Sequence, residues 1–145
     1  MALTVRLRPA TPADAAALAA IELESFPDPS WTDDDFLRYD CIVAEIGTIV
    51  GGFLVSREIS SGTADTPPER EILNLAIKPE FRRLGLAATL LANELKRAAN
   101  IFLEVRESNV AAVQLYKNAG FIEISRRRDY YDNPVESAIV MRTKW

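Results

Sequence analysis

A possible phosphate-binding segment lies near the middle of the chain, in the sequence RRLGLA at residues 82–87. It follows an apolar stretch typical of a strand, residues 71–77, and it runs into leucines at helical spacing. The first backbone N–H groups of a helix have no partner within the helix, and the helix dipole is positive at that end. Gly85 lets the backbone approach a ligand closely, and Arg82 and Arg83 add positive charge. The segment therefore has the chemistry of a seat for a phosphate or pyrophosphate.

The common nucleotide-binding motifs do not occur in the chain. Neither the GxxxxGK motif followed by Ser or Thr nor the GxGxxG motif is present. On these residues alone, the segment is equally compatible with an ordinary strand, turn and helix whose arginines are solvated. The rest of the sequence has to decide between the two interpretations.

The residue types present limit the possible catalytic chemistry. The chain has no histidine, which excludes Ser-His-Asp and Cys-His catalysis and argues against a catalytic zinc site. Cys41 is the single cysteine, and it stands in an apolar stretch that predicts a buried strand. We therefore expect a core thiol at Cys41, no bound metal, and acid–base chemistry from Glu, Asp, Tyr or Lys.

Length and composition indicate a soluble globular protein. The chain has 145 residues, of which 48% are apolar and 26% charged. No apolar run reaches the length of a membrane span, and the N-terminus lacks a signal-peptide core, so we expect a cytoplasmic protein without a membrane partner. The net charge of −4 argues against nucleic acid as the main partner. It suits a cationic substrate, although it also simply favours solubility.

The predicted elements follow the order β-α-α-β-β-β-α-β-α-β-β. Strands are expected at residues 4–8, 41–45, 49–57, 71–77, 101–106, 121–131 and 137–142, and helices at 15–25, 33–39, 86–97 and 110–118. Core candidates in the first two helices are Leu18, Ile21, Leu23, Trp31, Phe36 and Leu37. The middle βαβ unit requires parallel strands. The remaining strands are joined like hairpins, which predicts a mixed sheet with helices on both faces.

Three local signals refine this prediction. Thr11, followed by proline and three residues later by Asp14, is a helix start. Asn109 is the expected cap of the last helix, and Gly120 its C-terminal stop. Two glycines at residues 51–52, inside a strand, predict a bulge or a close backbone approach.

Several segments together resemble one enzyme family. The pattern Arg82-x-x-Gly85-x-Ala87 after a strand and before a helix is similar to the acetyl-CoA pyrophosphate loop of the GNAT N-acetyltransferase superfamily. The segment LEVRESN with the following helix and Gly-Phe, residues 103–121, resembles the branch that acetylates protein N-termini. Phe26-Pro27, and RDYY at residues 128–131, resemble the bacterial ribosomal-protein alanine acetyltransferases within it. The resemblance covers nearly the whole chain. It implies an α/β fold in one domain, residues 1–145, with a central mixed sheet of about seven strands and about four flanking helices.

The resemblance also implies a reaction and a set of site residues. The reaction would be acetyl transfer from acetyl-CoA to the N-terminal alanine of small-subunit ribosomal protein eighteen, a basic partner. The backbone of Leu75, Ala76 and Ile77 would bind the pantetheine arm and the acetyl carbonyl, and Asn109 would contact the CoA arm. The pyrophosphate would be bound by the loop residues Arg82, Arg83, Leu84, Gly85, Leu86, Ala87 and Ala88. Glu104 would be the general base, Tyr116 the general acid, and Phe26, Tyr130 and Tyr131 would line the peptide entrance.

The implied roles are chemically consistent. An N-terminal amine, with a pKa of about 8, must lose its proton before it attacks. A positioned carboxylate can take that proton, and a phenol can donate a proton or hydrogen bond to the leaving thiolate. A strand N–H group can stabilise the developing oxyanion. No metal is required.

Alternative interpretations remain open for most of these residues. Glu104 could be a surface carboxylate paired with Arg106, and Glu71 is a rival general base. Tyr116 could be a core aromatic anchor of its helix. Tyr130 and Tyr131 alternate along a strand, which predicts that one of them packs while the other binds.

The chain also departs from the family pattern. Leu84 stands where arginine or glycine is common, and Ala87 where glycine often occurs. The turn at residues 132–135 is short, at the place where peptide recognition is expected. The acceptor is therefore less certain than the cofactor. The alternatives are a GNAT enzyme acting on a small-molecule amine or a lysine, and a non-catalytic CoA-binding module.

Overall fold

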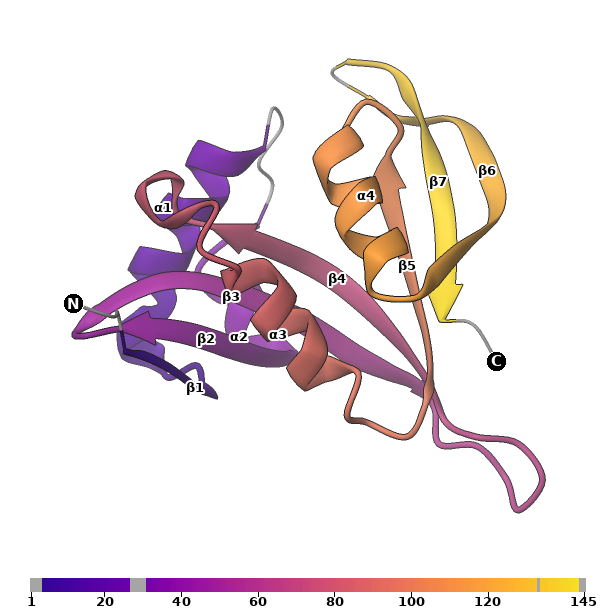
Figure 1. The fold of residues 1–145 in the computed structure, drawn as a ribbon, viewed down its shortest axis with the longest axis horizontal. Helices are drawn as coiled ribbons and strands as arrows, with labels where there is room; N and C mark the ends of the chain where they lie inside the picture. The colour runs from indigo at the N-terminus through magenta and orange to yellow at the C-terminus, as the bar shows by residue number, and fades with distance from the viewer. Residues whose placement is uncertain (1–3, 27–30, 133, 144–145) are drawn as a thin grey trace. The chain divides into compact units, whose positions relative to one another are not determined.

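The computed structural model describes residues 4–26, 31–132 and 134–143 (Figure 1). These residues form strands β1 (Val5–Pro9), β2 (Asp40–Ile46), β3 (Ile49–Ser60), β4 (Glu69–Ile77), β5 (Asn100–Arg106), β6 (Phe121–Tyr131) and β7 (Glu136–Thr143). The α-helices are α1 (Ala15–Ser25), α2 (Asp35–Arg38), α3 (Leu86–Glu94) and α4 (Val110–Asn118). Two short 3-10 helices, η1 (Pro12–Asp14) and η2 (Pro79–Phe81), complete the described elements. The predicted element order is confirmed, although α2 and α3 are shorter than expected.

The strands form a seven-stranded sheet in the order β1-β2-β3-β4-β5-β7-β6. Strands β1, β2 and β3 pair in antiparallel fashion. Strand β4 pairs with β5 in parallel, as the crossover through α3 requires, and β7 pairs antiparallel with both β5 and β6. The predicted mixed sheet is therefore confirmed.

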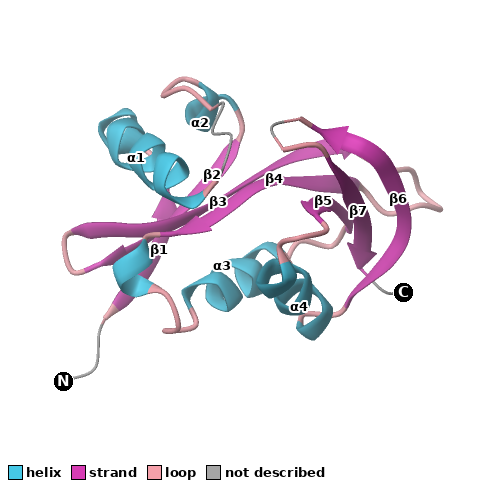
Figure 2. Cartoon of the chain, turned by 90° about the horizontal axis from the view of Figure 1, so that it is seen from above, coloured by secondary structure: helices cyan, strands magenta, loops and turns pink. Residues whose placement is uncertain are grey.

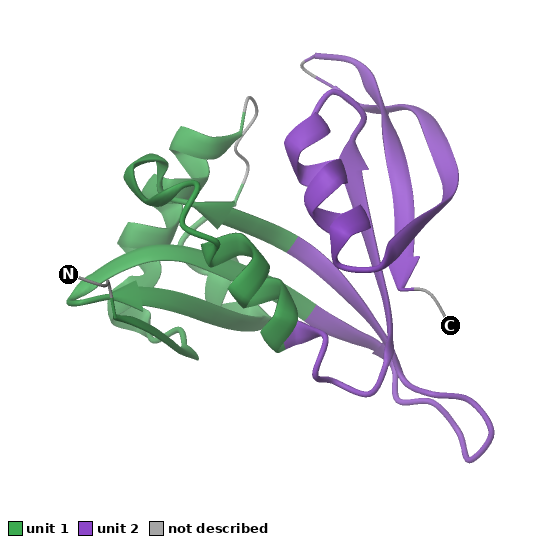
Figure 3. Cartoon of the chain, in the orientation of Figure 1, with its two compact units in different colours: residues 1–56, 74–93 green, residues 57–73, 94–145 purple. Residues whose placement is uncertain are grey.

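The chain divides into two compact units, neither of them continuous in sequence (Figure 3). Unit 1 comprises Met1–Ser56 and Asn74–Asn93, and unit 2 comprises Arg57–Leu73 and Glu94–Trp145. Within unit 1, α1 and α2 lie on one face of the strands and α3 on the other (Figure 2). Fully buried side chains of unit 1 include Leu18, Val43, Phe53, Leu90 and Leu91.

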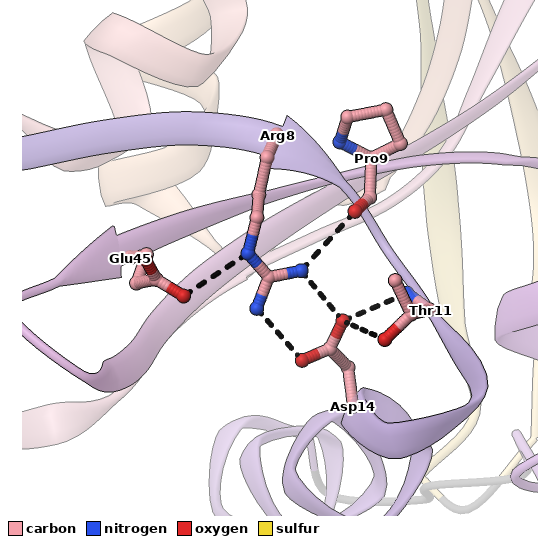
Figure 4. A network of polar contacts seen from close by, with 5 residues as sticks. All are labelled: Arg8, Pro9, Thr11, Asp14 and Glu45. Atoms are coloured by element: carbon pink, nitrogen blue, oxygen red, sulfur yellow. Dashed lines mark hydrogen bonds and ion pairs between the residues drawn. The ribbon is translucent and has the colours of Figure 1, made fainter.

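A polar network fixes the start of α1 (Figure 4). The guanidinium of Arg8 donates to both carboxylate oxygens of Asp14, at 2.8 and 2.9 Å, and to Glu45 at 3.0 Å. Asp14 also accepts from the backbone N–H of Thr11 at 2.7 Å, as the predicted helix start requires. These hydrogen bonds, chiefly the one from Arg8, lower the pKa of Asp14 to about 2. The network ties β1, β2 and α1 together.

The predicted core of the first two helices is only partly correct. Leu18, Ile21 and Phe36 are buried, but Leu23 is 69% exposed and Leu37 is 39% exposed. Glu22 faces the interior instead, because residues 18, 21 and 22 lie on one face of a helix and residue 23 does not.

The two glycines of β3 satisfy both parts of their prediction. Ala44 pairs with Gly52 and the next residue, Glu45, pairs with Val50, so Gly51 is the extra residue of a bulge. A Cβ atom on Gly52 would lie 2.9 Å from the carbonyl oxygen of Ala76, so β4 approaches there as only glycine permits. This approach holds the end of β4 close to β3.

Unit 2 contains α4 and the antiparallel strands after it. Asn109 caps α4 by accepting a hydrogen bond from the backbone N–H of Ala112 at 3.2 Å, and Gly120 ends the helix with φ +103°. Both are as predicted. The ring of Tyr116 contacts that of Phe121, with 5.7 Å between centroids, which packs α4 against β6.

Cys41 is buried, and desolvation raises the pKa of its thiol to about 12, as expected for a core residue. None of the described helices is long and apolar enough to cross a membrane. Residues 27–30, which include Pro27 of the Phe26-Pro27 pair, and residue 133 lie outside the described residues.

Candidate functional site

The predicted phosphate seat is a loop of unit 1 that joins β4 to α3. Strand β4 ends at Ile77, η2 makes one turn, and α3 begins at Leu86. Arg83 has φ 65° and Gly85 has φ 77°, so two residues of the loop adopt the left-handed region. The backbone N–H groups of Leu86, Ala87 and Ala88 stand in the first turn of α3, where a helix offers them no partner of its own. Consecutive unpaired amides at a helix N-terminus form a concave anion site.

Arg82 has a different place from the one expected. Its Nε donates to the carbonyl oxygen of Ile77 at 3.1 Å, and its Nη2 lies 3.4 Å from the hydroxyl of Ser25. The guanidinium therefore fastens the loop to the end of β4 and to α1. The free amides of the loop, rather than this side chain, are the groups available to a phosphate.

The loop geometry fits a pyrophosphate. A Cβ atom built on Gly85 would meet nothing within 4 Å, so the space in front of the glycine is open. Leu86 is buried and anchors the first turn of α3, while Leu84 is 51% exposed. Ala87 and Ala88 add little bulk beside the open amides. A diphosphate could thus reach the backbone without displacing a side chain.

The other residues of unit 1 that the sequence assigned to the site lie near the ends of β4 and α1. Leu75 is half-buried, and Ala76 and Ile77 are buried. The half-buried Phe26 follows α1, and its N–H donates to the carbonyl oxygen of Glu22 at 3.2 Å.

Unit 2 contains a pocket of about 470 Å³. Its lining comes from strands β3, β4, β5 and β6. The residues are Arg57, Glu71, Ile72, Leu73, Glu104, Arg127, Tyr130 and Tyr131. Three residues predicted from the sequence, Glu104, Tyr130 and Tyr131, therefore lie around one pocket, together with the rival base Glu71.

Glu104 comes from β5, and its side chain is 20% exposed. Its Oε1 lies 3.2 Å from Nε of Arg127, so its ionic partner is not Arg106, which the alternative interpretation named. Arg106 pairs instead with Glu136 at 2.9 Å. The interaction with Glu104, more than any other cause, raises the pKa of Tyr130.

Glu71 reaches the same pocket from β4. Glu71 pairs with Phe102 in the β4–β5 ladder, and Phe102 and Glu104 lie on one face of β5, so the two carboxylates share a face of the sheet. Oε1 of Glu71 accepts from Nε and Nη2 of Arg57 at 3.2 and 3.0 Å. The pocket thus holds two carboxylates, and each is paired with an arginine.

Tyr130 and Tyr131 both line the pocket, so they do not lie on opposite faces as strand alternation predicts. Asp129 has φ 47°, and the β6–β7 register is lost between Arg127 and Tyr131. This break cancels the strand alternation, and the two rings contact each other with centroids 5.2 Å apart. Desolvation, followed by the charge of Glu104, raises the pKa of Tyr131 to about 12.

Tyr116 is buried, only 7% exposed, and does not line the described pocket. Burial raises the pKa of its hydroxyl, and the electrostatic influence of Tyr131 adds to the shift. The hydroxyl therefore stays protonated at neutral pH and can act as a hydrogen-bond donor. Its ring packs on Phe121, so the structural part of the alternative interpretation is correct.

Three arginines of unit 2 were not predicted as site residues. Arg57 and Arg127 pair with the pocket carboxylates. The guanidinium of Arg106 lies 4.3 Å from the ring of Tyr131 and donates to the carbonyl oxygens of Asp132 and Pro134. The run of arginines at 126–128 could have signalled one of them, but nothing in the sequence shows which carboxylate each would meet. The described residues contain no group of histidine, cysteine and acidic side chains that could hold a metal ion.

Comparison with known proteins identifies similar chains. Residues 12–121 match the family model described as Acetyltransferase (GNAT) family. The N-alpha-acetyltransferase RimI of Mycobacterium tuberculosis is 33% identical over 138 residues, which cover 91% of this chain and 87% of that protein.

A second relative is the ribosomal protein bS18-alanine N-acetyltransferase of Escherichia coli K12, which is 40% identical over 80 residues. This match covers 50% of the chain, and it spans about half, 54%, of the relative's length. The crystal structure of the ribosomal-protein-S18-alanine N-acetyltransferase from Escherichia coli aligns with a TM-score of 0.80 at 28% identity. That alignment covers 97% of this chain and 93% of the other.

Proposed function

Since the chain belongs to the acetyltransferase (GNAT) family, we propose that it transfers the acetyl group of acetyl-CoA to the α-amino group at a protein N-terminus. The observation that carries this proposal is the place of Glu104. Its carboxylate is partly shielded, at the end of a sheet strand, in a pocket lined by two tyrosines. Such a carboxylate can accept a proton from an amine that enters the pocket.

The loop of unit 1 is the proposed binding site for the cofactor's pyrophosphate. The amides of residues 86–88 lie in the first turn of α3, and the space in front of Gly85 is open. When bound, acetyl-CoA supplies an activated acetyl thioester. The backbone of Leu75, Ala76 and Ile77 is proposed to bind the pantetheine arm and the acetyl carbonyl, and Asn109 to contact the CoA arm in addition to capping α4.

The proposed chemistry needs one group that accepts a proton from the amine and one that donates a proton or hydrogen bond to the leaving sulfur. Glu104 takes one proton from the acceptor ammonium, which frees the nitrogen lone pair to bond to the acetyl carbon. As the carbon–sulfur bond breaks, the nitrogen gives up its second proton to solvent, and the sulfur departs as a thiolate to which the hydroxyl of Tyr116 donates a hydrogen bond or proton. The raised pKa of Tyr116 favours the hydrogen-bond role, because a buried phenol releases its proton reluctantly.

The proposed acceptor is the N-terminal alanine of small-subunit ribosomal protein S18. The names of the relatives from Escherichia coli and Mycobacterium tuberculosis support this choice, since both describe N-terminal acetyltransferases or alanine acetyltransferases. Phe26, Tyr130 and Tyr131 are proposed to contact the peptide. Two pocket carboxylates, Glu71 and Glu104, suit a positively charged N-terminus. We propose that residues 1–145 act as one catalytic domain, in the cytoplasm.

The test is acetylation of paired peptides. The full chain is incubated with acetyl-CoA and a peptide that begins with alanine and is rich in arginine, and released CoA is measured with a thiol reagent. The same peptide with a blocked N-terminus serves as the control. Turnover of the free peptide alone supports the proposal. Equal turnover of both peptides indicates a lysine acetyltransferase, and acetyl-CoA binding without turnover of any amine indicates a non-catalytic module.

A further inference from the structure

Arg127 lies directly beside the proposed general base, Glu104. Its Nε lies 3.2 Å from Oε1 of Glu104, and its guanidinium carbon lies 5.0 Å from the centre of the Tyr130 ring. The proposed base is therefore paired with a cation carried by β6, and that cation also lies over an aromatic ring of β6.

The ion pair between Arg127 and Glu104 is suited to exchange. The side chain of Arg127 is 57% exposed, and an ion pair with so much solvent contact contributes little stability. Water can solvate the guanidinium as it leaves. The Glu104 side chain is only 20% exposed, so water solvates its carboxylate less well, and a replacement cation stabilises that charge. An acceptor ammonium is such a cation.

The β6 segment that carries these groups is weakly tied to its neighbour. Arg127 pairs with Ala138 and Tyr131 with Glu136, so three residues of β6 face the single residue between those partners on β7. Asp129, inside this segment, adopts φ 47°. The segment can therefore shift without breaking a regular ladder of hydrogen bonds.

The other carboxylate of the described pocket lining is held more firmly than Glu104. Glu71, the other acid of the lining, is bound by Arg57 through two contacts of 3.0 and 3.2 Å. Exchange at Glu104 replaces one contact of 3.2 Å to Arg127, whereas exchange at Glu71 would replace two contacts to Arg57. Glu104 is thus the carboxylate more readily released to an incoming cation.

On the premise of the acetyltransferase function, we propose that Arg127 is a gating residue that holds Glu104 until the ammonium of the acceptor replaces it. Arg127 is a positioning residue that acts through Glu104. It discriminates against weakly bound cations, because every acceptor must compete with a tethered guanidinium. Once displaced, the guanidinium is free to remain over the Tyr130 ring.

The test compares Arg127→Gln, Arg127→Lys and a matched control, Arg126→Gln. Arg126 is the adjacent residue of β6, is 52% exposed and pairs with Glu123 and Glu107, neither of which lines the pocket. Initial rates with the alanine peptide at low ionic strength give KM and kcat. Arg127→Gln is expected to lower the KM for the peptide about three- to tenfold with little change in kcat, since one competing cation is removed. For Arg127→Lys and Arg126→Gln, the KM for the peptide is expected to stay within about twofold of the wild-type value.

A binding experiment separates this proposal from the proposed function. Tetramethylammonium carries the charge of an acceptor but cannot be acetylated, so its affinity is independent of turnover. NMR titration of the full chain should show tighter binding of this cation to Arg127→Gln than to wild type or Arg126→Gln. In the wild type, the Nε–H signal of Arg127 should shift as the cation binds, which requires no variant to fold. The gating proposal is overturned if the three proteins bind the cation equally, or if both variants bind it more tightly by the same factor. It is also overturned if the Arg127 signal does not shift, even where the enzyme acetylates its peptide.

Discussion

The side-chain amide of Asn74 donates a hydrogen bond of 2.6 Å to Oε2 of Glu22, and both residues are buried in unit 1. The pair joins α1 to β4 one residue before the segment proposed to bind the cofactor. Desolvation raises the pKa of Glu22 above its ordinary value of 4.5, and Asn74 offsets only part of that shift. A buried carboxyl group of this kind makes the stability of the fold depend on pH.

The first prediction concerns the sign of this dependence. Folded protein holds the Glu22 proton more tightly than unfolded protein, so the stabilisation is fully present below about pH 4.5 and is lost as the pH rises through the raised pKa. Urea unfolding at a series of pH values should show wild type losing stability relative to Glu22→Gln as the pH rises. Glu24→Gln, on the exposed side of α1, is the control. A stability difference independent of pH would contradict the assignment.

Asp14 should show the opposite sign. Its pKa is lowered from 3.8 to about 2, chiefly by the hydrogen bonds from Arg8, so its contribution is present above pH 3.8 and is lost as the pH falls toward 2. The shift corresponds to about 2 kcal/mol of unfolding free energy. Asp14→Asn is expected to lose about that amount at pH 7 and to converge with wild type near pH 2. Thermal unfolding of both proteins between pH 2 and pH 7 measures this difference in stability. A difference that does not change with pH would argue against the hydrogen bonds of Asp14.

These two carboxyls show what the sequence could and could not predict. The cap at Thr11 and Asp14 is a local pattern of four residues, and the structure confirms it. The burial of Glu22 depends on a partner 52 residues away, and an apolar neighbour, Leu23, misled the prediction of the core. Hydrogen bonds between neighbouring residues can be predicted from a sequence, whereas the pairing of polar groups that lie far apart in the chain cannot.

The same division holds for the fold and the candidate site. The order of elements followed from apolar periodicity and from turn residues such as Gly120, and it is correct. The grouping of Glu104, Tyr130 and Tyr131 was implied by resemblance, and all three line one pocket. Their detailed arrangement was not predictable, because it depends on the backbone of Asp129, whose φ of 47° no residue pattern indicates.

The phosphate seat gives a prediction with a close internal control. Gly85 and Gly47 both have positive φ, 77° and 61°, and neither has an atom within 4 Å of an added Cβ. A valine at either position therefore costs similar backbone strain, of the order of 1–2 kcal/mol. Only Gly85→Val should weaken acetyl-CoA binding, by about tenfold or more, because its side chain would occupy the ligand's space. Isothermal titration calorimetry decides; equal affinity in the two variants would remove the loop from the proposed site.

The choice between the two candidate bases can be tested by paired substitutions. Glu104→Gln is expected to lower kcat by about 10²–10⁴-fold, since a general base of that efficiency is lost. Glu71→Gln, which removes a carboxylate already bound by Arg57, is expected to cost less than about tenfold. Single-turnover rates with saturating acetyl-CoA provide the measurement, and calorimetry confirms that cofactor affinity is retained. The reverse order of the two losses would transfer the base role to Glu71.

Tyr116 provides the last test, because its two suggested roles predict different results. Tyr116→Phe keeps the ring that packs on Phe121, so an anchoring role predicts unchanged stability and unchanged turnover. A donor role predicts a kcat lower by about 10- to 100-fold at unchanged thermal stability, since only the hydroxyl is lost. We expect the second result, because burial raises the pKa of this hydroxyl and keeps it protonated. Tyr116→Leu separates the roles further: it removes both ring and hydroxyl, and should lower the melting temperature as well as kcat. Full activity in Tyr116→Phe would leave Tyr116 with packing alone and would require another donor for the sulfur.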